Sequence, residues 1–332
     1  MKKIKIGIIG CGGIGRKRAV SLPLGSQVVA FADINLARAH SLAEDFSAVA
    51  FEDWTRVAEI DEIEAIIVST LHQSLVEIAI GAIKSGKHVF LEKPAARNVA
   101  ELDTLIATAK VHKKIVRVGF NHRYHRSLRK AREIVDSGAL GELMFIRGRY
   151  GHGARVGYEK EWRADPHLSG GGELIDQGPH LIDLSSWFLG EFSEITGHAQ
   201  NYFWDMPVDD NAFMLLKTPD GKTASLQVSC TEWKNLFSFE IYGKLGKLDL
   251  SGLGGSYGVE KITWYKMLPE MGPPETTTWE YPMPDNSWHL EISEFVEDIR
   301  EGRDPNVGLR EARAALSVVE KIYRDSGYDH NS

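Results

Sequence analysis

Cysteine is scarce in this sequence, with only Cys11 and Cys230 among 332 residues. Two thiols so far apart in the chain form neither a disulfide framework nor a cysteine-rich zinc site, and they suit a reducing compartment. No apolar run approaches membrane-spanning length, and the stretch Met1–Ile9 lacks a secretory apolar core with a small-residue cleavage site. We therefore expect a cytoplasmic protein that has no membrane partner.

An excess of positive charge is also absent, because 39 Lys and Arg residues face 46 Asp and Glu residues, a formal net charge of -7. Proteins that bind nucleic acid carry a basic footprint, so we expect no nucleic acid partner. The spacing of His122, His125, His152 and His167 matches no metal site, and we predict none. Hydrophobic residues make up 43%, as in ordinary globular proteins, and the length is sufficient for two domains.

The first third of the chain alternates short apolar strands with amphipathic helices. Strands that read as nearly continuous apolar runs are typical of a parallel sheet buried on both faces. The predicted strands are Lys3–Ile9, Gln27–Ala32, Ala65–Val68, His88–Leu91 and Val116–Val118. The predicted helices are Ile14–Leu22, Leu36–Phe46, Ser74–Lys84 and Val99–His112. This alternation predicts an α/β fold, a doubly wound parallel sheet of the Rossmann type, over residues 1–122.

Strands without intervening helices dominate the remainder of the chain, after a predicted helix at Ser127–Ser137. These strands are Glu142–Tyr150, Glu194–Tyr202, Ala212–Leu216, Thr223–Ser229, Leu236–Ile241 and Ile262–Tyr265. The pattern indicates an α+β domain with a large, mostly antiparallel sheet over residues 123–332. We assign the two closing helices, within residues 288–326, to this domain. The proline-rich stretch Pro269–Pro284 is predicted to be an irregular loop or a sheet edge.

A glycine-rich turn follows the first predicted strand. Gly10 permits the tight turn, Gly12 lets the backbone approach a pyrophosphate, and Gly15 allows close packing of helix on sheet. The pyrophosphate would lie on the N–H groups at the start of the next helix, near Gly13 and Ile14. The turn therefore predicts a dinucleotide site.

The acidic residue Asp33 ends the second predicted strand. A carboxylate at that point accepts hydrogen bonds from ribose hydroxyls and repels a 2′-phosphate, which favours NAD over NADP as the cofactor. The alternative role for Asp33 is to cap the helix Leu36–Phe46. Arg38 is a further cofactor-binding candidate, although a solvated helix face is the interpretation that we favour for it.

Two further motifs carry a family resemblance. One is Glu92-Lys93-Pro94, directly after a predicted strand, and the other runs from Gly170 to Asp183 with the sequence GGGELIDQGPHLID. With the glycine-rich turn, they resemble the glucose–fructose oxidoreductase, inositol dehydrogenase and rhizopine-catabolism (Gfo/Idh/MocA) family over nearly the whole chain. The resemblance implies an NAD-dependent oxidoreductase that transfers a hydride between nicotinamide and a secondary hydroxyl or ketone of a sugar or polyol.

The same resemblance implies three catalytic residues. It places Lys93 beside the nicotinamide and the reacting hydroxyl, and it places Asp176 and His180 against the substrate. A histidine suits acceptance of the hydroxyl proton, whereas Lys93 either stabilises the developing alkoxide or is itself the base. Asp176 and His180, four residues apart, share one helix face if a helix begins near Ile175 or Asp176, which would put Pro179 in its first turn.

Other residues are assigned by their place in the family pattern or near these motifs. The additional cofactor-binding candidates are Thr70, His72, Glu92, Asn121, Trp162 and Arg163. The additional substrate-binding candidates are His122, Arg123, Tyr150, His152 and Arg155. Thr70 and His72 are chosen because this loop contacts the cofactor in the family, although Ser69–Leu75 departs from the family pattern of a proline and a later histidine. Glu92 is expected to orient Lys93 or the cofactor ribose.

The segment Arg147–Arg163 holds four arginines and one lysine against two glutamates, a local net charge of +3. Arginine binds phosphate, and long irregular loops often bind ligands. We therefore expect a phosphorylated or nucleotide-activated sugar that reacts at its 3-position. The alternatives are that these arginines contact the cofactor or another subunit, and that the substrate is a free sugar or inositol.

Two other classes of function remain open: a glycoside hydrolase that uses bound NAD transiently, and a non-catalytic NAD-binding regulator. The presence of both Lys93 and His180 argues against the regulator. The resemblance also implies a homodimer or homotetramer that forms through the sheet of the second domain.

Overall fold

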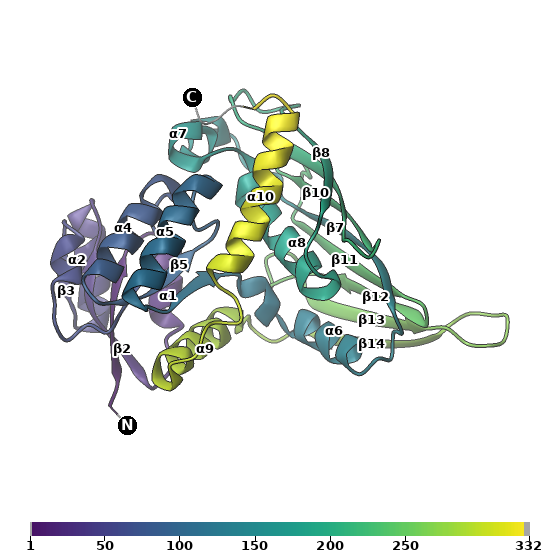
Figure 1. Ribbon diagram of the computed structural model, residues 1–332, viewed down its shortest axis with the longest axis horizontal. Coiled ribbons are helices and arrows are strands. Elements are labelled where there is room, and N and C mark those ends of the chain that lie inside the picture. The colour runs from purple at the N-terminus through teal and green to yellow at the C-terminus, as the bar shows by residue number, and fades with distance from the viewer. Residues whose placement is uncertain (1, 329–332) are drawn as a thin grey trace. The chain divides into compact units, whose positions relative to one another are not determined.

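The computed structural model describes residues 2–328 and divides the chain into two compact units. The first unit comprises Met1–Phe120 and Trp288–Arg313, and the second comprises Asn121–Ser287 and Ala314–Ser332. Figure 1 labels the elements of each unit. Among the described residues, no helix is long and apolar enough to cross a membrane.

A six-stranded parallel sheet forms the centre of the first unit, in the order β3-β2-β1-β4-β5-β6. This is the strand order of the dinucleotide-binding Rossmann fold, and it confirms the predicted fold class. The strands are β1 (Ile4–Ile9), β2 (Ser26–Ala32), β3 (Val49–Phe51), β4 (Ala65–Val68), β5 (His88–Glu92) and β6 (Val116–Gly119). Only β3 was not predicted, because three residues are too short to show a period.

Helices follow the strands of this sheet along the chain. They are α1 (Gly13–Val20), α2 (Leu36–Phe46), α3 (Thr55–Ala58), α4 (His72–Lys84) and α5 (Val99–His112). The side chains of Asn35 and Asn98 accept hydrogen bonds from the N–H groups of Arg38 and Glu101, three residues further on. These caps fix the starts of α2 and α5 at the residues that the sequence predicts.

Helix α9 (Ser287–Glu301) completes the core of the first unit, although it comes from the far end of the chain. Its residues Ile292, Phe295 and Val296 belong to the same buried cluster as side chains of β1, β2 and β5. The rings of Phe90 and Phe295 meet edge to face with centroids 5.6 Å apart. The structure therefore differs from the predicted domain division, because the apolar stripe of α9 is buried on the first sheet. Helix α10 (Leu309–Asp325) contributes its residues up to Arg313 to the first unit as well.

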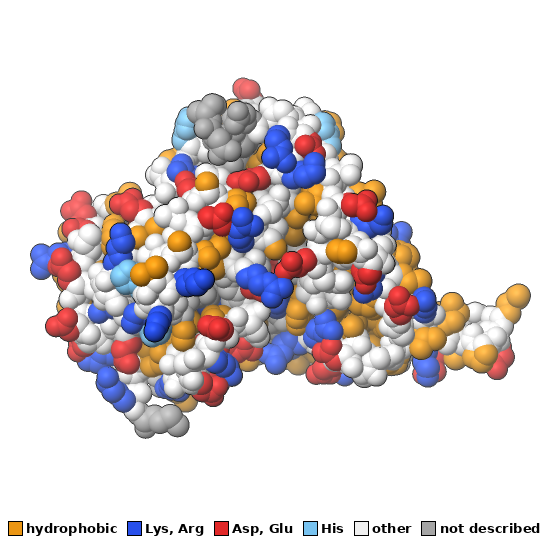
Figure 2. All heavy atoms as spheres, viewed as in Figure 1, with side chains coloured by type: hydrophobic (Ala, Val, Ile, Leu, Met, Phe, Trp, Pro, Cys, Tyr) orange, Lys and Arg blue, Asp and Glu red, His pale blue; other side chains and the backbone are white. Residues whose placement is uncertain are grey.

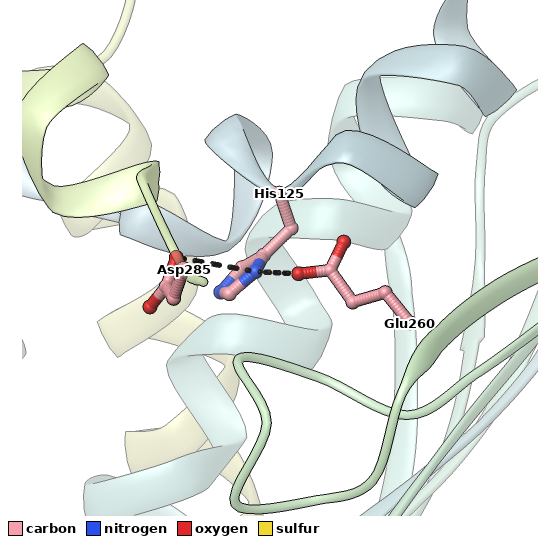
Figure 3. A group of neighbouring side chains, drawn as sticks. All are labelled: His125, Glu260 and Asp285. Carbon is pink, nitrogen blue, oxygen red and sulfur yellow. Dashed lines mark hydrogen bonds and ion pairs between the residues drawn. The ribbon is translucent and has the colours of Figure 1, made fainter. Parts of the chain in front are cut away.

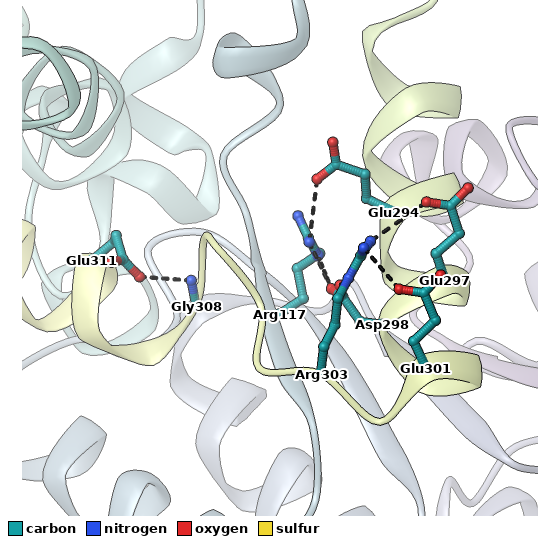
Figure 4. A network of polar contacts seen from close by, with 8 residues as sticks. All are labelled: Arg117, Glu294, Glu297, Asp298, Glu301, Arg303, Gly308 and Glu311. Atoms are coloured by element: carbon teal, nitrogen blue, oxygen red, sulfur yellow. Dashed lines mark hydrogen bonds and ion pairs between the residues drawn. The ribbon is translucent and has the colours of Figure 1, made fainter.

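A buried arginine of β6 ties α9 to the sheet (Figure 4). Nε and Nη2 of Arg117 donate to one oxygen of Asp298, at 3.0 and 2.6 Å, and both residues are 1% exposed. The other oxygen of Asp298 accepts from Nε of Arg303 at 2.6 Å. The backbone of Arg117 also forms an antiparallel bridge with Gly308, just before α10. Side-chain charge and backbone pairing thus hold the segment after α9 against β6.

The second unit is built on an eight-stranded sheet, in the order β14-β13-β12-β11-β7-β10-β9-β8. Its strands are β7 (Leu143–Gly151), β8 (Glu194–Gln200), β9 (Asn211–Lys217), β10 (Thr223–Ser229), β11 (Leu236–Gly243), β12 (Gly246–Ser251), β13 (Glu260–Lys266) and β14 (Glu275–Tyr281). Every neighbouring pair is antiparallel except β7 with β10, which confirms the mostly antiparallel sheet. Strand β12 was not predicted, and β14 forms an edge within the stretch predicted to be a loop or a sheet edge.

Helices cover one face of this sheet and leave the other face open. Figure 1 shows α6 (Arg126–Asp136), α8 (Glu173–Leu189) and α10 on the same side of the strands. Along β9, Ala212, Met214 and Leu216 are buried, whereas Phe213 and Leu215 are 43% and 54% exposed. The short elements of this unit are η1 (Asn121–Tyr124), η2 (Tyr158–Lys160), η3 (Trp162–Ala164) and α7 (Pro166–Ser169).

Helix α8 begins at Glu173, so the predicted start near Ile175 or Asp176 is wrong. Pro179 consequently lies inside the helix and not in its first turn. Proline has no N–H, so the carbonyl of Ile175 loses its helical donor at this point. The helix continues through the proline because nearly all of its side chains are buried. Asp176 and His180 still lie four residues apart on this helix, as predicted.

Candidate cofactor and substrate sites

Four glycines lie in the turn after β1 and at the start of α1. Two of them are required by the packing of the protein, and two face open space. Gly10 has a φ of +93°, and a Cβ there would lie 2.5 Å from the carbonyl oxygen of Ser69. A Cβ on Gly15 would lie 1.9 Å from the carbonyl oxygen of Gly10. At Gly12 and Gly13, by contrast, an added Cβ would meet nothing within 4 Å. No side chain caps the start of α1, so its N–H groups fit a dinucleotide pyrophosphate.

Asp33 lies directly after β2 and is bonded to this turn. Its Oδ2 accepts the N–H of Cys11 at 2.7 Å, and its Oδ1 accepts the N–H of Asn35 at 2.8 Å. Each carboxylate oxygen keeps a further lone pair, which fits the diol of an adenosine ribose. The alternative interpretation of Asp33 as the cap of α2 is wrong, because the side chain of Asn35 accepts the N–H of Arg38. Arg38 itself is exposed on α2.

The loop between β4 and α4 packs against the same turn. Oγ of Ser69 donates to the carbonyl oxygen of Gly10 at 2.9 Å. The hydroxyl of Thr70 accepts from Ser74 at 3.0 Å, and His72, the first residue of α4, is 5% exposed. The loop thus lies where a cofactor-contacting loop is needed, and the roles of Thr70 and His72 remain predictions.

Glu92 and Lys93 stand at the end of β5, where the Lys93–Pro94 peptide is cis. The carboxylate of Glu92 accepts from Nε of Arg18 at 2.5 Å, and Arg18 lies on α1. The glycine-rich helix is therefore linked directly to the loop that carries Lys93. This bond supports an orienting role for Glu92, whereas its contact with the cofactor stays a prediction.

Arg18 is the centre of a buried charge cluster that also includes α9. Its Nη1 donates to Glu291 at 2.6 Å, and its guanidinium lies 4.3 Å from the ring centroids of both Phe90 and Trp288. Arg18 and Glu291 are both 0% exposed. Burial raises the pKa of Glu291 to about 7, although the charge of Arg18 acts in the opposite direction. One cation thus faces two carboxylates.

In the second unit, Asp209 holds the N-terminus of α8. Its Oδ1 accepts the N–H of Gly172 at 3.0 Å and the hydroxyl of Tyr323 at 2.7 Å, and its Oδ2 accepts the N–H of Leu174 at 2.7 Å. Asp209 is fully buried, and burial raises its pKa to about 6 despite these donors. Because α8 carries Asp176 and His180, this cap fixes the position of the predicted catalytic residues.

The predicted catalytic residue Asp176 is bound by an arginine. Its Oδ2 accepts from Nε of Arg163 at 3.0 Å, and the guanidinium of Arg163 lies 4.6 Å from the ring centroid of Trp162. Burial lowers the pKa of Arg163, but the carboxylate of Asp176 raises it above its ordinary value overall. Arg163, which lies in η3, is thus bonded to the helix that carries the predicted catalytic residues, whereas its contact with the cofactor remains a prediction.

The ring of His180 stacks on that of His122, which belongs to η1. The ring centroids are 3.8 Å apart, and the planes differ by 20°. Tyr150 of β7 presents an edge to both rings, with centroids 5.1 and 6.1 Å away. Burial, followed by Tyr257, raises the pKa of Tyr150 well above its ordinary value, so its hydroxyl stays neutral. Three of the predicted residues are therefore brought together.

His152 follows β7 and faces a buried carboxylate of α8. Its Nδ1 accepts the N–H of Ala154 at 3.0 Å, and its Nε2 lies 3.5 Å from Oε1 of Glu173. Burial lowers the pKa of His152, but Glu173 more than offsets this and raises it. The ring is thus fixed with its Nε2 proton towards Glu173, a residue that the sequence analysis did not single out.

The two other predicted residues of η1 make structural bonds. Nε and Nη2 of Arg123 donate to the two oxygens of Asp183 at 2.8 and 2.6 Å, a paired contact with α8. Nδ2 of Asn121 donates to Oγ of Ser287 at 3.3 Å. These bonds position η1, and the ligand contacts predicted for Arg123 and Asn121 remain predictions.

Every arginine of the positively charged segment has a carboxylate partner within the second unit. The pairs are Arg147 with Glu240 at 3.0 Å, Arg149 with Glu232 at 3.0 Å, Arg155 with Glu161 at 2.6 Å, and Arg163 with Asp176 at 3.0 Å. The local charge is therefore compensated. The excess of positive charge no longer argues for a phosphate group on the substrate.

One group of side chains could be considered for a metal: His125, Glu260 and Asp285 (Figure 3). Nδ1 of His125 lies 2.6 Å from Glu260 and 3.8 Å from Asp285. Two ligand atoms of one tetrahedral ion stand roughly 3.3 Å apart, given bonds near 2.0–2.1 Å, so the 2.6 Å separation fits a hydrogen bond. Glu260 also accepts the N–H of Ser127, and Asp285 accepts that of Ser287. The group therefore locks the start of α6.

The sequence analysis missed residues that hold the functional segments of each unit, namely Arg18 and Glu291 in the first unit and Glu173 and Asp209 in the second. Arg18 and Glu173 lie inside or next to recognised motifs, so their place in those motifs was an available signal. Asp209 and Glu291 lie far from any motif, and only the tertiary structure shows their partners.

Two sequence patterns of known families match the chain. The pattern described as "Oxidoreductase family, NAD-binding Rossmann fold" matches residues 4–120, and that described as "GFO/IDH/MocA C-terminal domain" matches residues 128–249. Together they span more than two thirds of the chain. A Rossmann unit with an open glycine turn defines a dinucleotide-dependent enzyme. The chain belongs to the Gfo/Idh/MocA family of NAD-binding oxidoreductases, which confirms the predicted family, enzyme class and cofactor.

The characterised relatives of this chain carry several different enzyme names. Levoglucosan dehydrogenase of Pseudarthrobacter phenanthrenivorans is 25% identical over 292 residues, which cover 75% of this chain and 73% of the relative. Glucose-6-phosphate 3-dehydrogenase of Bacillus subtilis is 33% identical over 196 residues, covering 58% and 55%. The solved structure of a levoglucosan dehydrogenase in complex with NADH and levoglucosan superposes with a TM-score of 0.90 at 20% identity, covering 98% of both chains. At that identity the structural match shows the fold alone.

Proposed function

We propose that the protein oxidises a secondary hydroxyl of a sugar or polyol, with NAD as the hydride acceptor, or reduces the corresponding ketone. The observation that carries the proposal is the cluster on α8. Asp176 and His180 are 6% and 5% exposed, and they stand among Arg163, His122 and Tyr150. These groups offer several hydrogen-bond donors and acceptors, which suits a polyhydroxylated ligand. The family membership supports the redox chemistry.

His180 is proposed to take the hydroxyl proton as the carbon loses its hydride. Bound NAD supplies the hydride acceptor. An imidazole changes its charge near neutral pH, which suits a general base. Lys93 is proposed to act on the same hydroxyl, where its ammonium stabilises the developing alkoxide. Asp176, held by Arg163, is proposed to bind a neighbouring hydroxyl and not to move a proton.

We propose an uncharged sugar or polyol as the substrate, in place of the phosphorylated or nucleotide-activated sugar that the sequence suggested. The pairing of Arg147, Arg149, Arg155 and Arg163 with carboxylates supports this choice. Oxidation at the 3-position is the first regiochemistry to test, because a glucose-6-phosphate 3-dehydrogenase is among the relatives.

A second copy of the chain is the proposed partner, packed on the open face of the eight-stranded sheet. Exposed Phe213 and Leu215 on β9 support this. Figure 2 shows hydrophobic side chains gathered along the outer border of this sheet. A large exposed apolar area is typical of an interaction surface.

The test is a panel of free sugars, inositol, glucose 6-phosphate and a nucleotide sugar, assayed by NADH absorbance with the wild type and His180→Ala. We expect the highest kcat/KM with a free sugar or polyol. His180→Ala should lose at least about 100-fold in turnover and keep its affinity for NAD, since general acid–base catalysis contributes about 10²–10⁴-fold. His167→Ala, at an exposed residue of α7, is the matched control.

Near-normal turnover in His180→Ala would show that this histidine is not the base. A clear preference for the phosphorylated substrate would reject the uncharged one. A nitrophenyl glycoside that is cleaved without net NADH would instead identify a hydrolase with transient redox chemistry.

A further inference from the structure

The ring that stacks on His180 is itself titratable. His122 and His180 are 4% and 5% exposed, and their centroids are only 3.8 Å apart. They come from different elements, η1 and α8, so the contact is not a consequence of helical spacing. On its far side, His122 meets the edge of His125 at 5.7 Å, and Nδ1 of His122 lies 3.3 Å from Oδ1 of Asn121.

The charges around this pair are mostly neutralised by partners of their own. Within the second unit, several charged or titratable groups lie near the two rings or contact their neighbours. Four sets are paired: His125 with Glu260 and Asp285, Asp176 with Arg163, Asp183 with Arg123, and His152 with Glu173. The hydroxyls of Tyr150 and Tyr257 complete the group. The carboxylates nearest to His180 along α8, Asp176 and Asp183, are each bound by an arginine. Neither carboxylate therefore offers an unbalanced negative charge that would support two protonated imidazoles.

Two imidazolium ions cannot both be accommodated at this separation. Like charges about 4 Å apart in a buried, poorly solvated place repel strongly, and each opposes protonation of the other. Interacting groups of this kind titrate as a pair, in two steps that belong to both. Between these steps the pair carries a single proton.

We propose that His122 is the positioning residue of His180, and that the two stacked imidazoles form a unit that carries at most one proton while the enzyme works. This inference rests on the proposed role of His180 as the base. Stacking fixes the plane of the His180 ring. A proton on either ring prevents His180 from accepting the proton of the substrate hydroxyl.

The proposal fixes the direction of a pH effect. Because protonation of either ring blocks oxidation, the wild type loses activity at a higher pH than an enzyme with only His180 to protonate. In His122→Phe an aromatic ring remains, but it takes up no proton. The acid limb of kcat/KM for oxidation should therefore move to lower pH, by roughly 0.3–1 pH unit. Because His122 also belongs to the proposed ligand-binding group, His122→Phe is expected to lower kcat, and the readout is the position of the acid limb relative to each variant's own plateau. His122→Ala, which removes the stacked ring, should lose more activity than His122→Phe.

The experiment compares pH profiles of kcat/KM for the wild type, His122→Phe and His167→Phe, with thermal unfolding to verify that each variant is folded. A lower acid limb in His122→Phe alone supports the pair. An unchanged limb, or one that moves to higher pH, overturns it.

Histidine NMR titrations of the wild type, His122→Phe and His180→Phe give a second readout that is independent of turnover. We expect both rings to respond to one shared protonation in the wild type, each with a partial amplitude. When the other ring is Phe, each should titrate alone with a full amplitude and with a midpoint at lower pH. Identical titrations of His180 with and without His122 would disprove the coupling.

If His180→Ala keeps its turnover, the proposed function fails even where NMR finds the coupling. If His180→Ala is inactive and His122→Phe changes neither readout, only this inference fails.

Discussion

Arg18 faces two carboxylates, so the buried cluster of the first unit is short of one positive charge. Glu92 and Glu291 bind different nitrogens of the same guanidinium, and Glu291 is fully buried on α9. A Cβ on Gly119 would lie 2.9 Å from Nη2 of Arg18 and 3.0 Å from Oε2 of Glu92, so no larger residue fits beside the pair. The loop that carries Lys93 is therefore held by a compact charged group.

Removing the charge of Glu291 should change how stability depends on pH. The pKa of Glu291 is raised to about 7 by burial, above its ordinary value of 4.5, so the folded chain holds this proton more firmly than the unfolded chain. Its contribution to stability is complete below pH 4.5 and is lost as the pH rises through 7. Glu291→Gln should match the wild type near pH 5 and exceed it at pH 8 by up to roughly 3 kcal/mol.

Urea unfolding followed by intrinsic tryptophan fluorescence at both pH values measures this difference. Glu301→Gln, on the exposed end of α9, is the control. A difference between Glu291→Gln and the wild type that is the same at both pH values would contradict the assignment.

For single residues, the sequence motifs identified candidate functional side chains but not the residues that contact them. Gly10, Gly15 and Asp33 could be predicted because local backbone geometry demands them. The stacking of His122 on His180 could not, because it depends on how η1 and α8 pack. The count of charges in the segment Arg147–Arg163 could not include the carboxylates of other strands that pair with its arginines, and the phosphorylated or nucleotide-activated substrate stays an untested prediction.

Among the elements, α8 depends most on a residue from outside itself. The first N–H groups of a helix have no acceptor within the helix. At the start of α8, Asp209 accepts two of these N–H groups together with the hydroxyl of Tyr323. An asparagine has one acceptor oxygen, and its amide nitrogen would face an N–H donor. Asp209→Asn should therefore cost about 2–3 kcal/mol of unfolding free energy and lower kcat, with the affinity for NAD unchanged.

Denaturation in urea, kcat and NAD calorimetry check this, with exposed Asp205→Asn from the same loop as the control. Tyr323→Phe removes the hydroxyl that donates to Asp209 and accepts the N–H groups of Gly172 and Ile175, so it should lose about 1–3 kcal/mol. Asp209→Asn that is as stable and active as the wild type would refute the capping role.

Element prediction succeeded wherever a periodic segment had clear ends. The helix Leu36–Phe46 and the strand Thr223–Ser229 were found with their observed bounds, since caps and turns mark them. Strand β12 was missed because Gly246–Ser251 has only two buried apolar side chains, Leu248 and Leu250, among polar residues. The start of α8 was misplaced because a proline was taken to mark a first turn, although burial along the helix tolerates it at Pro179.

For the whole molecule, the position of α9 along the sequence did not reveal which unit contains it. Its amphipathic pattern predicts a helix with one apolar face, but not which sheet that face covers. Buried Phe295, the Asp298–Arg117 pair and the Glu291–Arg18 pair decide it. The division into two domains was thus accessible from pattern, whereas the exchange of terminal helices required tertiary contacts.

The open face of the eight-stranded sheet leads to the last prediction. Phe213 and Leu215 point away from the helices, and β9 lies between β8 and β10, so their exposed surface belongs to the sheet and not to a loop. If a second copy packs here, a buried carboxylate at position 213 would lack a partner and would weaken the association.

We expect the wild type to sediment as a dimer or larger, and Phe213→Asp to dissociate at least tenfold more readily. Val111→Asp, at an apolar residue of α5 that is 76% exposed against 43% for Phe213, should leave the assembly unchanged. Sedimentation over a hundredfold range of concentration measures this, and a wild type that is monomeric throughout would rule out the sheet as a subunit interface.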